Sequence, residues 1–238
     1  MFIIIANFGN DSIALIQWAK SQGLKDLKVV SVDTGWAAPR WQSRVVQAEK
    51  FVINSGFEYI RLTSPLSFPE LAKAKHNFPS TKFHWCAKFL KGLPILDYLD
   101  EVDADLDAVV LLSKRRDQAK KLADLPEFEI ESELFGWRKL WQPMCEYDLS
   151  QRNKLIGQAG FELLETRSLE CDPCIYNQLG DFKAMQPQTK QQLDLLEAEL
   201  AKPMFSEAVM AQLEDKNLGA DQRDIYFTGC GSEFGCGE

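Results

Sequence analysis

The first 62 residues alternate between short apolar runs and longer segments of helical periodicity, and this alternation restricts the fold more than any other feature. The apolar runs, each of a length that suits a buried strand, are residues 1–6, 27–32 and 57–62. Residues 11–23 and 39–56 between them carry the signals of helices, and a glycine follows each one as a stop. Strands joined through helices predict β-α-β units and therefore a parallel sheet.

The rest of the chain continues this pattern less regularly. Residues 107–113 predict another buried strand, and residues 140–144 an edge strand or a turn. Three further helical segments are residues 85–101, interrupted near Gly92 and Pro94, then 149–161 and 189–202. We therefore expect an α/β domain over residues 1–180, and a mostly helical extension with a Cys/Gly-rich tail packed on it over residues 181–238.

The charge of the chain limits its partners. The formal net charge is −8, which argues against a stand-alone binder of the nucleic-acid backbone. Two local runs are nevertheless basic, and no acidic residue lies between Glu70 and Asp97. The first run contains Lys73, Lys75, Lys82, Lys88 and Lys91, and the second contains Lys114, Arg115, Arg116, Lys120 and Lys121. These runs are either two solvated faces or two loops that face one anionic ligand.

The sequence also indicates a compartment. Residues 1–6 are too few for a membrane span and have no basic flank of the signal-peptide kind, so we expect a cytoplasmic protein with no membrane partner. In such a protein a Cys-x-x-Cys pair indicates a metal or redox site before a disulfide.

The turn "NFGNDS", residues 7–12, follows the first predicted strand. Ligands of open parallel sheets bind beyond the carboxyl ends of the strands, so this turn is well placed. Gly9 allows close backbone approach, the N–H groups at the following helix start lack intrahelical partners, and Ser12 adds a hydroxyl. An anion site and a plain turn capped by Asn10 or Asp11 both fit these residues.

Several stretches together resemble the PP-loop, or adenine nucleotide alpha-hydrolase-like, superfamily, which includes the phosphoadenosine phosphosulfate reductases. "NFGNDS" resembles its SGGxDS loop, although Asn7 and Phe8 depart from the usual Ser-Gly. "VVSVDTGW" has the DTG of the reductases, "CAKFLKGLPILDYL" resembles their cysteine segment, and "LLSKRRDQAKK" their strand and Arg-containing loop. The resemblance spans residues 1–180 and implies a Rossmann-like sheet.

The resemblance implies a nucleotide site and a reaction. Family members that use ATP cleave it between the α- and β-phosphates, release pyrophosphate and leave AMP on an acceptor oxygen, with Mg²⁺ as the expected clamp. Residues that would bind the nucleotide are Asn7, Phe8, Gly9, Asn10, Asp11, Ser12, Asp33, Thr34 and Gly35. Residues that would act in catalysis are Asp11, Ser12, Lys88, Lys91, Arg115 and Arg116.

The cysteines predict a second site. Cys171 and Cys174 can turn to the same side of a tight loop, and Cys86 is a natural third ligand, with Cys230 or Cys236 as the fourth. In some members of the reductase family, cysteines at such positions hold a [4Fe–4S] cluster, which is what the resemblance implies here. A structural zinc ion, and reduced thiols without metal, remain open as alternatives.

Three functions are compatible with these features. The first is ATP-dependent sulfur incorporation into nucleic acid, similar to the reductase-like ATP pyrophosphatases of Dnd and Ssp DNA phosphorothioation systems; partner proteins would then present the DNA, and a cysteine desulfurase would supply sulfur. The second is a sulfonucleotide reductase, which the tail "TGCGSEFGCGE" disfavours because it lacks that family's Glu-Cys-Gly-Leu-His-like ending. The third is a nucleotide-binding scaffold without catalysis.

Overall fold

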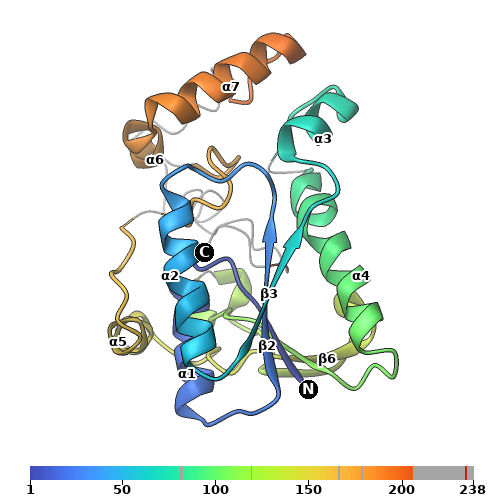
Figure 1. The fold of residues 1–238 in the computed structure, drawn as a ribbon, viewed down its shortest axis with the longest axis vertical. Helices are drawn as coiled ribbons and strands as arrows, with labels where there is room; N and C mark the ends of the chain where they lie inside the picture. Colours follow the sequence, from blue (N-terminus) through green and yellow to red (C-terminus); the bar gives the residue numbers. More distant parts are fainter. Residues whose placement is uncertain (81–82, 119, 166, 178, 206–233, 235–238) are drawn as a thin grey trace.

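The computed structural model of the chain describes residues 1–80, 83–118, 120–165, 167–177, 179–205 and 234 (Figure 1). Cys230, Cys236 and Lys82 lie outside these residues. Six strands form one sheet in the order β3-β2-β1-β4-β6-β5. The strands are β1 (Phe2–Ile5), β2 (Leu27–Asp33), β3 (Glu58–Thr63), β4 (Val109–Leu111), β5 (Phe128–Ser132) and β6 (Arg138–Trp141).

The sheet is parallel except at one edge. β1 pairs with β2 on one side and with β4 on the other, and β4 pairs with β6, all in parallel. Only β5 runs antiparallel, against β6. The chain winds outward from β1 in one direction and then restarts at β4, so the switch of strand order lies between β1 and β4, where open α/β sheets form a crevice at the carboxyl ends.

Helices cover both faces of this sheet. The longer ones are α1 (Asn10–Ser21), α2 (Trp41–Asn54), α3 (Phe68–Lys75), α4 (Leu93–Val102), α5 (Leu149–Gln158) and α7 (Pro187–Leu200). The shorter ones are the π-helix η1 (Ala87–Gly92), the 3₁₀ turns η2 (Arg116–Gln118), η3 (Lys120–Leu122) and η4 (Glu133–Phe135), and α6 (Leu179–Ala184). In Figure 1, β2 and β3 run toward the end of the molecule where α3, α6 and α7 lie.

Alternate residues of β1 belong to two separate cores. Ile4 packs with α1 and α2 side chains such as Leu15 and Val52, whereas Ile3 and Ile5 pack with α4 side chains such as Ile95. Because successive strand residues point to opposite faces, a run of four apolar residues is what a strand covered on both faces requires. The short apolar runs of the sequence are thus explained by burial on both sides.

The predicted fold class is confirmed: the protein is α/β, with a mostly parallel sheet flanked by helices. Of the two alternatives for residues 140–144, the edge strand was wrong, since Leu140 and Trp141 belong to β6, an inner strand between β4 and β5; residues 143–144 form the turn that was the other alternative. The helix predicted over residues 85–101 changes type where an interruption was expected: the π-helix η1 ends at Gly92 and α4 begins at Leu93. Pro94 has no N–H to donate, but the backbone stays helical to Val102.

The strand β5 and the helix α3 were not predicted. The edge strand β5 has a half-exposed face, and its charged residues Glu129 and Glu131 concealed it. α3 begins at Ser67, whose hydroxyl accepts from the Glu70 N–H while the Glu70 carboxylate accepts from the Ser67 N–H at 2.7 Å. This capping box is the pattern S-x-x-E, with a proline in the first turn, and it was visible in the sequence.

The described part of the C-terminal extension is helical, in α6 and α7, and residues 206–233 fall outside the described range. Phe234 is buried and packs edge-on against Phe135 at 5.7 Å. Any side chain at Gly92 would collide with it, because a Cβ there would lie 2.7 Å from the Phe234 ring. No helix in the described ranges combines the length and the apolar character that crossing a membrane needs.

Arg138 joins the end of α4 to β6 from a fully buried position. Its guanidinium donates to the Asp103 carboxylate at 2.7 Å and to the Leu99 and Asp103 carbonyls at 3.0 and 2.8 Å. The Asp103 carboxylate also accepts from the Asp107 and Ala108 N–H groups at 3.1 Å. A buried charge with this many partners is costly to leave alone.

We expect Arg138→Met to lower the free energy of unfolding by about 3 kcal/mol or more, since it leaves the Asp103 carboxylate buried without its cation. Lys139→Met is the matched control on the same strand, because its ion pair with Asp107 is solvent-exposed, and it should cost under about 0.5 kcal/mol. Urea denaturation measures both. Asp103→Asn added to Arg138→Met should recover part of the loss; equal effects of the two single variants would contradict this role.

Candidate functional site

The turn after β1 has a fixed shape that its own side chains impose. The Asn7 carboxamide oxygen accepts from the Gly9 N–H at 2.7 Å and from the Ser12 hydroxyl at 2.9 Å. Asn7, Gly9 and Ser12 are all buried. The first N–H groups of α1 have no partner within the helix, so the turn presents donors at the carboxyl edge of the sheet.

Phe8 has an unusual backbone conformation for a bulky residue. Its φ is +60°, in the left-handed region that glycine adopts without strain. Its ring is buried, 5.8 Å from that of Tyr59, and its carbonyl accepts from the Arg44 guanidinium at 2.8 Å. Packing and this hydrogen bond together hold a conformation that the residue alone would avoid.

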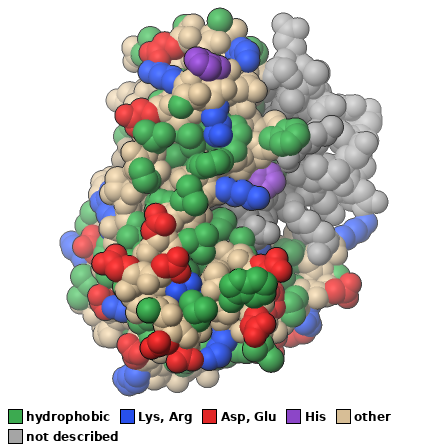
Figure 2. All heavy atoms as spheres, turned by 90° about the vertical axis from the view of Figure 1, so that its right-hand side faces the viewer, with side chains coloured by type: hydrophobic (Ala, Val, Ile, Leu, Met, Phe, Trp, Pro, Cys, Tyr) green, Lys and Arg blue, Asp and Glu red, His purple; other side chains and the backbone are tan. Residues whose placement is uncertain are grey.

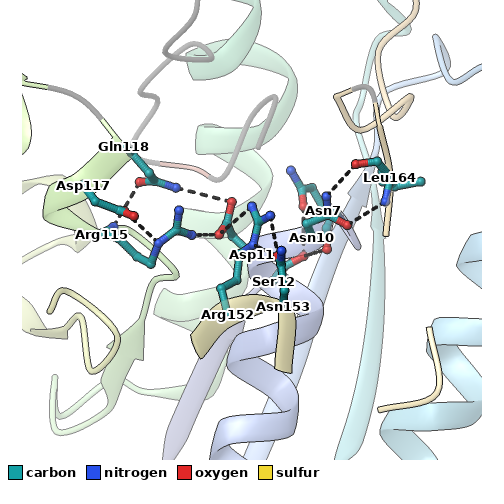
Figure 3. A network of polar contacts seen from close by, with 11 residues as sticks. Asn7, Asn10, Asp11, Ser12, Arg115, Asp117, Gln118, Arg152, Asn153 and Leu164 are labelled. Atoms are coloured by element: carbon teal, nitrogen blue, oxygen red, sulfur yellow. Dashed lines mark hydrogen bonds and ion pairs between the residues drawn. The ribbon is translucent and has the colours of Figure 1, made fainter. Parts of the chain in front are cut away.

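Two asparagines tie the turn to the segment that precedes the cysteine pair (Figure 3). The Asn10 side chain donates to the Leu164 carbonyl and accepts from the Leu164 N–H, both at 3.0 Å. The Asn7 amide donates to the Ser168 hydroxyl at 3.3 Å. These contacts explain how residues 164–165 and 167–174, far away in sequence, come to lie beside the first turn.

Asp11 lies in a buried cluster of charged side chains, also drawn in Figure 3. Its carboxylate forms an ion pair with Arg115, from the loop after β4, and a second one at 3.6 Å with Arg152 of α5. Gln118 donates to it at 3.3 Å, and Arg115 also pairs with Asp117 at 2.9 Å. The cluster lies at the switch point between β1 and β4. There the Asp11 carboxylate joins its own helix, α1, to the loop after β4 and to α5.

The predicted cationic residues divide into two groups. Arg115 and Lys91 are buried at the site, and Lys91 pairs with Glu170 at 3.0 Å. Lys88 is exposed on η1, and Arg116 pairs with Glu146 and donates to the Leu125 carbonyl at 2.9 Å. The structure therefore places Lys91 beside the cysteines and Arg115 beside the first turn. It places Lys88 and Arg116 elsewhere.

One hollow lies at the ends of β1 and β2, where the nucleotide was predicted. Its lining includes Asn7, Phe8, Asp33, Thr34 and Glu170. Asp33 accepts from the Gly35 N–H at 2.9 Å and from Arg61 at 2.7 Å. Gly35 has a φ of +65° and no room for a side chain, since a Cβ would lie 2.7 Å from that of Ser67.

A second hollow contains three of the predicted cysteines. Cys86, Cys171 and Cys174 line it together with Lys91 and Glu170, among other residues. The Thr34 hydroxyl is 3.3 Å from the Cys171 sulfur and donates to the Glu170 carbonyl at 3.2 Å. Thr34 and Glu170 line both hollows, so the predicted nucleotide and thiol sites are neighbours.

The predicted metal centre is not confirmed. Among the residues that the structure describes, no three His, Cys, Asp or Glu side chains form a set that could hold a metal ion. The candidates for a fourth ligand, Cys230 and Cys236, lie outside those residues. Cys145 is a buried thiol away from this hollow, and burial raises its pKa above the ordinary value.

Several residues of the site were missed by sequence reasoning. Glu170, Ser168, Arg152 and Arg61 all contact predicted residues, but each does so across a large separation in sequence. The Lys91–Glu170 pair spans 79 positions and the Asn7–Ser168 contact 161. Only Glu170 had a local signal, because it directly precedes Cys171.

Solved structures that are similar to this chain include two enzymes. A phosphoadenylyl-sulfate (PAPS) reductase from Candida auris, in its phosphate complex, is 18% identical with a TM-score of 0.49, over 68% of this chain and 74% of that one. An NH3-dependent NAD synthetase from Campylobacter jejuni subsp. jejuni, in complex with the nitrate ion, is 13% identical with a TM-score of 0.43, over 90% and 81%. No protein-family profile and no curated protein sequence matches the chain. At such identities and TM-scores, neither likeness assigns an activity.

The pKa of Asp33 provides a test of the contacts in the hollow at the ends of β1 and β2. Burial raises the pKa of its carboxyl, but the Gly35 N–H and the Arg61 cation outweigh burial, so the pKa lies below the ordinary 3.8. A lowered folded-state pKa stabilises the protein above the unfolded-state value, and this stability is lost as the pH falls through the folded-state value.

We therefore expect Arg61→Gln to raise the pKa of Asp33 and to lower stability at neutral pH, with the difference from wild type shrinking as the pH falls through the folded-state pKa of Asp33. An NMR titration of the Asp33 carboxyl carbon and urea denaturation measure the two effects. Lys28→Gln, which removes a neighbouring pair with Glu58, should leave the titration of Asp33 unchanged. An unchanged Asp33 pKa in Arg61→Gln would show that Arg61 does not lower the pKa of Asp33.

Proposed function

We propose that this chain is a PP-loop ATP pyrophosphatase that adenylates an oxygen of a nucleic acid and then replaces this oxygen with sulfur. The observation that supports this best is that two hollows share Thr34 and Glu170, one with the PP-loop-like turn and the other with three cysteines. DNA, converted to a phosphorothioate, is the acceptor that we propose from the resemblance to the Dnd and Ssp enzymes.

The first turn would bind the phosphates of ATP. The N–H groups in the first turn of α1 have no partner within the helix, and the helix dipole there favours an anion. Asp33 and Thr34 would face the nucleoside. An acceptor oxygen attacks the α-phosphorus, the bond to the β-phosphate breaks, and pyrophosphate leaves. The chain would contribute position and charge compensation, and the Arg115–Asp11–Arg152 cluster would keep the turn rigid.

The resemblance implies two inorganic cofactors, Mg²⁺ and an iron–sulfur cluster or zinc ion. Mg²⁺ bound with ATP would offset the charge of the phosphates, but the Asp11 carboxylate is already held by two arginines. The described residues likewise form no ligand set for a [4Fe–4S] cluster or zinc. In the proposed reaction the cysteines therefore act as thiols.

Sulfur transfer would begin on Cys171. Its sulfur contacts Thr34, one of the two residues that line both hollows. A partner cysteine desulfurase would load Cys171 with a second sulfur atom as a persulfide. The outer sulfur attacks the adenylated phosphorus, and AMP leaves with the electrons of the broken P–O bond. The Cys174 thiolate then attacks the Cys171 sulfur, the acceptor keeps the outer sulfur, and a Cys171–Cys174 disulfide forms. An external dithiol reduces this disulfide by exchange.

The test uses the full chain, purified without oxygen, with Mg-ATP, DNA, a cysteine desulfurase and ³⁵S-cysteine. We expect AMP and pyrophosphate from the wild type and ³⁵S in the DNA. Cys171→Ser should still form AMP and pyrophosphate but lose sulfur transfer by at least about a hundredfold, because the nucleophile is gone. Cys145→Ser is the matched control and should keep both activities, because Cys145 lies outside the hollow.

Two results would reject the proposal. Intact ATP under all conditions would remove the pyrophosphatase and favour a nucleotide-binding scaffold. Release of sulfite from an adenylyl sulfate with a dithiol reductant, without turnover of ATP, would assign the same two hollows to a sulfonucleotide reductase.

A further inference from the structure

A surface of lysines and aromatic rings adjoins the thiol hollow, which is the hollow lined by Cys86, Cys171 and Cys174. Phe83 is 75% exposed and Phe89 is 43% exposed, so both side chains are open to solvent in part. Lys75, at the end of α3, lies 4.3 Å from the centroid of the Phe89 ring and 5.6 Å from that of Trp85. We call this the aromatic–lysine surface; it consists of Lys73, Lys75, Phe83, Trp85, Lys88 and Phe89.

The charge of this surface is opposite to that of the whole chain. The net charge is −8, yet no Asp or Glu lies between Glu70 and Asp97 in the sequence. Figure 2 shows Lys, His and hydrophobic side chains across the upper half of this face, while Asp and Glu side chains gather mainly in the lower half. Lys73 pairs with Glu199 of α7, and Lys75 and Lys88 are exposed. The surface is therefore suited to an anion that also offers flat apolar groups.

A row of stacked rings connects this surface to the thiol hollow. Trp85 stacks on Phe68 with their centroids 6.1 Å apart, and Phe68 stacks on buried Trp36 at 5.0 Å. Phe68 and Cys86 both line the hollow, and Cys86 directly follows Trp85 in the chain. A ligand on the surface would thus lie next to the cysteines.

We propose that the aromatic–lysine surface binds single-stranded nucleic acid, and so holds the acceptor of the proposed sulfur transfer; the inference rests on that proposed function. Unpaired bases stack on exposed aromatic rings, and lysines contact the phosphates between them. A duplex hides its base faces, and an acidic peptide would use the lysines but leave the rings exposed. The combination of both groups selects a single strand.

The experiment measures binding of a fluorescein-labelled oligothymidylate of about 12 nucleotides to the full chain by fluorescence anisotropy. Lys75→Ala/Phe89→Ala should weaken binding at least about tenfold, because it removes both a ring that stacks on a base and a lysine that contacts a phosphate. The matched control is Lys50→Ala/Phe128→Ala, which removes an exposed lysine of α2 and a 47%-exposed phenylalanine of β5, and should change binding less than about twofold.

ATP binding is measured on the same samples and should be equal in all of them, since neither variant touches the first turn. If the wild type binds ATP but not the oligonucleotide, the inference is wrong and the proposed function stands. If it binds the oligonucleotide through Lys75 and Phe89 but never ATP, the surface is correct and the proposed function fails. Equal affinity for duplex DNA, or for polyglutamate with the same response to the variants, would overturn the single-strand assignment.

Discussion

The parallel sheet, covered by helices on both faces, is the constraint on which the rest of this molecule depends. Parallel strands bring their carboxyl ends to one edge, so the loops after β1, β2 and β4 must meet there. The turn around Gly9, the Asp33–Gly35 turn and the Arg115 loop are separated by tens of residues, yet they surround one region. The sequence between them mainly forms the helices that return the chain to the start of the next strand.

Buried ion pairs fix these loops relative to one another. Asp11 with two arginines, and Lys91 with Glu170, are each held almost out of solvent. Such pairs add little net stability compared with apolar packing, because both partners lose hydration. They do penalise any arrangement in which one partner is misplaced, so a carboxylate between two cations suits a loop that must hold one geometry. Glu170 lines both hollows, so the geometry that its pair with Lys91 holds includes a wall that the two hollows share.

Local patterns were enough to predict much of this structure, and tertiary contacts account for the rest. The strands at residues 2–5 and 27–33 and the helices between them follow from apolar runs, helical periodicity and glycine stops. The position of β6 inside the sheet did not, because strand order depends on which neighbour buries an apolar face. Cys86 was expected near Cys171 and Cys174, and the three do line one hollow. Glu170, Ser168 and Arg152 could not be predicted, because their partners lie far away in the sequence.

The first turn, after β1, holds its shape through its own side chains. Asn7 supplies an oxygen that accepts from the Gly9 N–H and the Ser12 hydroxyl, so the turn is closed by its first residue. Phe8 adopts the positive φ that glycine reaches without strain, and it does so against a cost of about 1–3 kcal/mol. Its buried ring and the hydrogen bond from Arg44 offset that cost. A strained residue that its surroundings hold in place, at the end of the central strand, gives the turn one fixed shape: the Gly9 N–H is directed to Asn7, and the N–H groups in the first turn of α1 are left without a partner inside the helix.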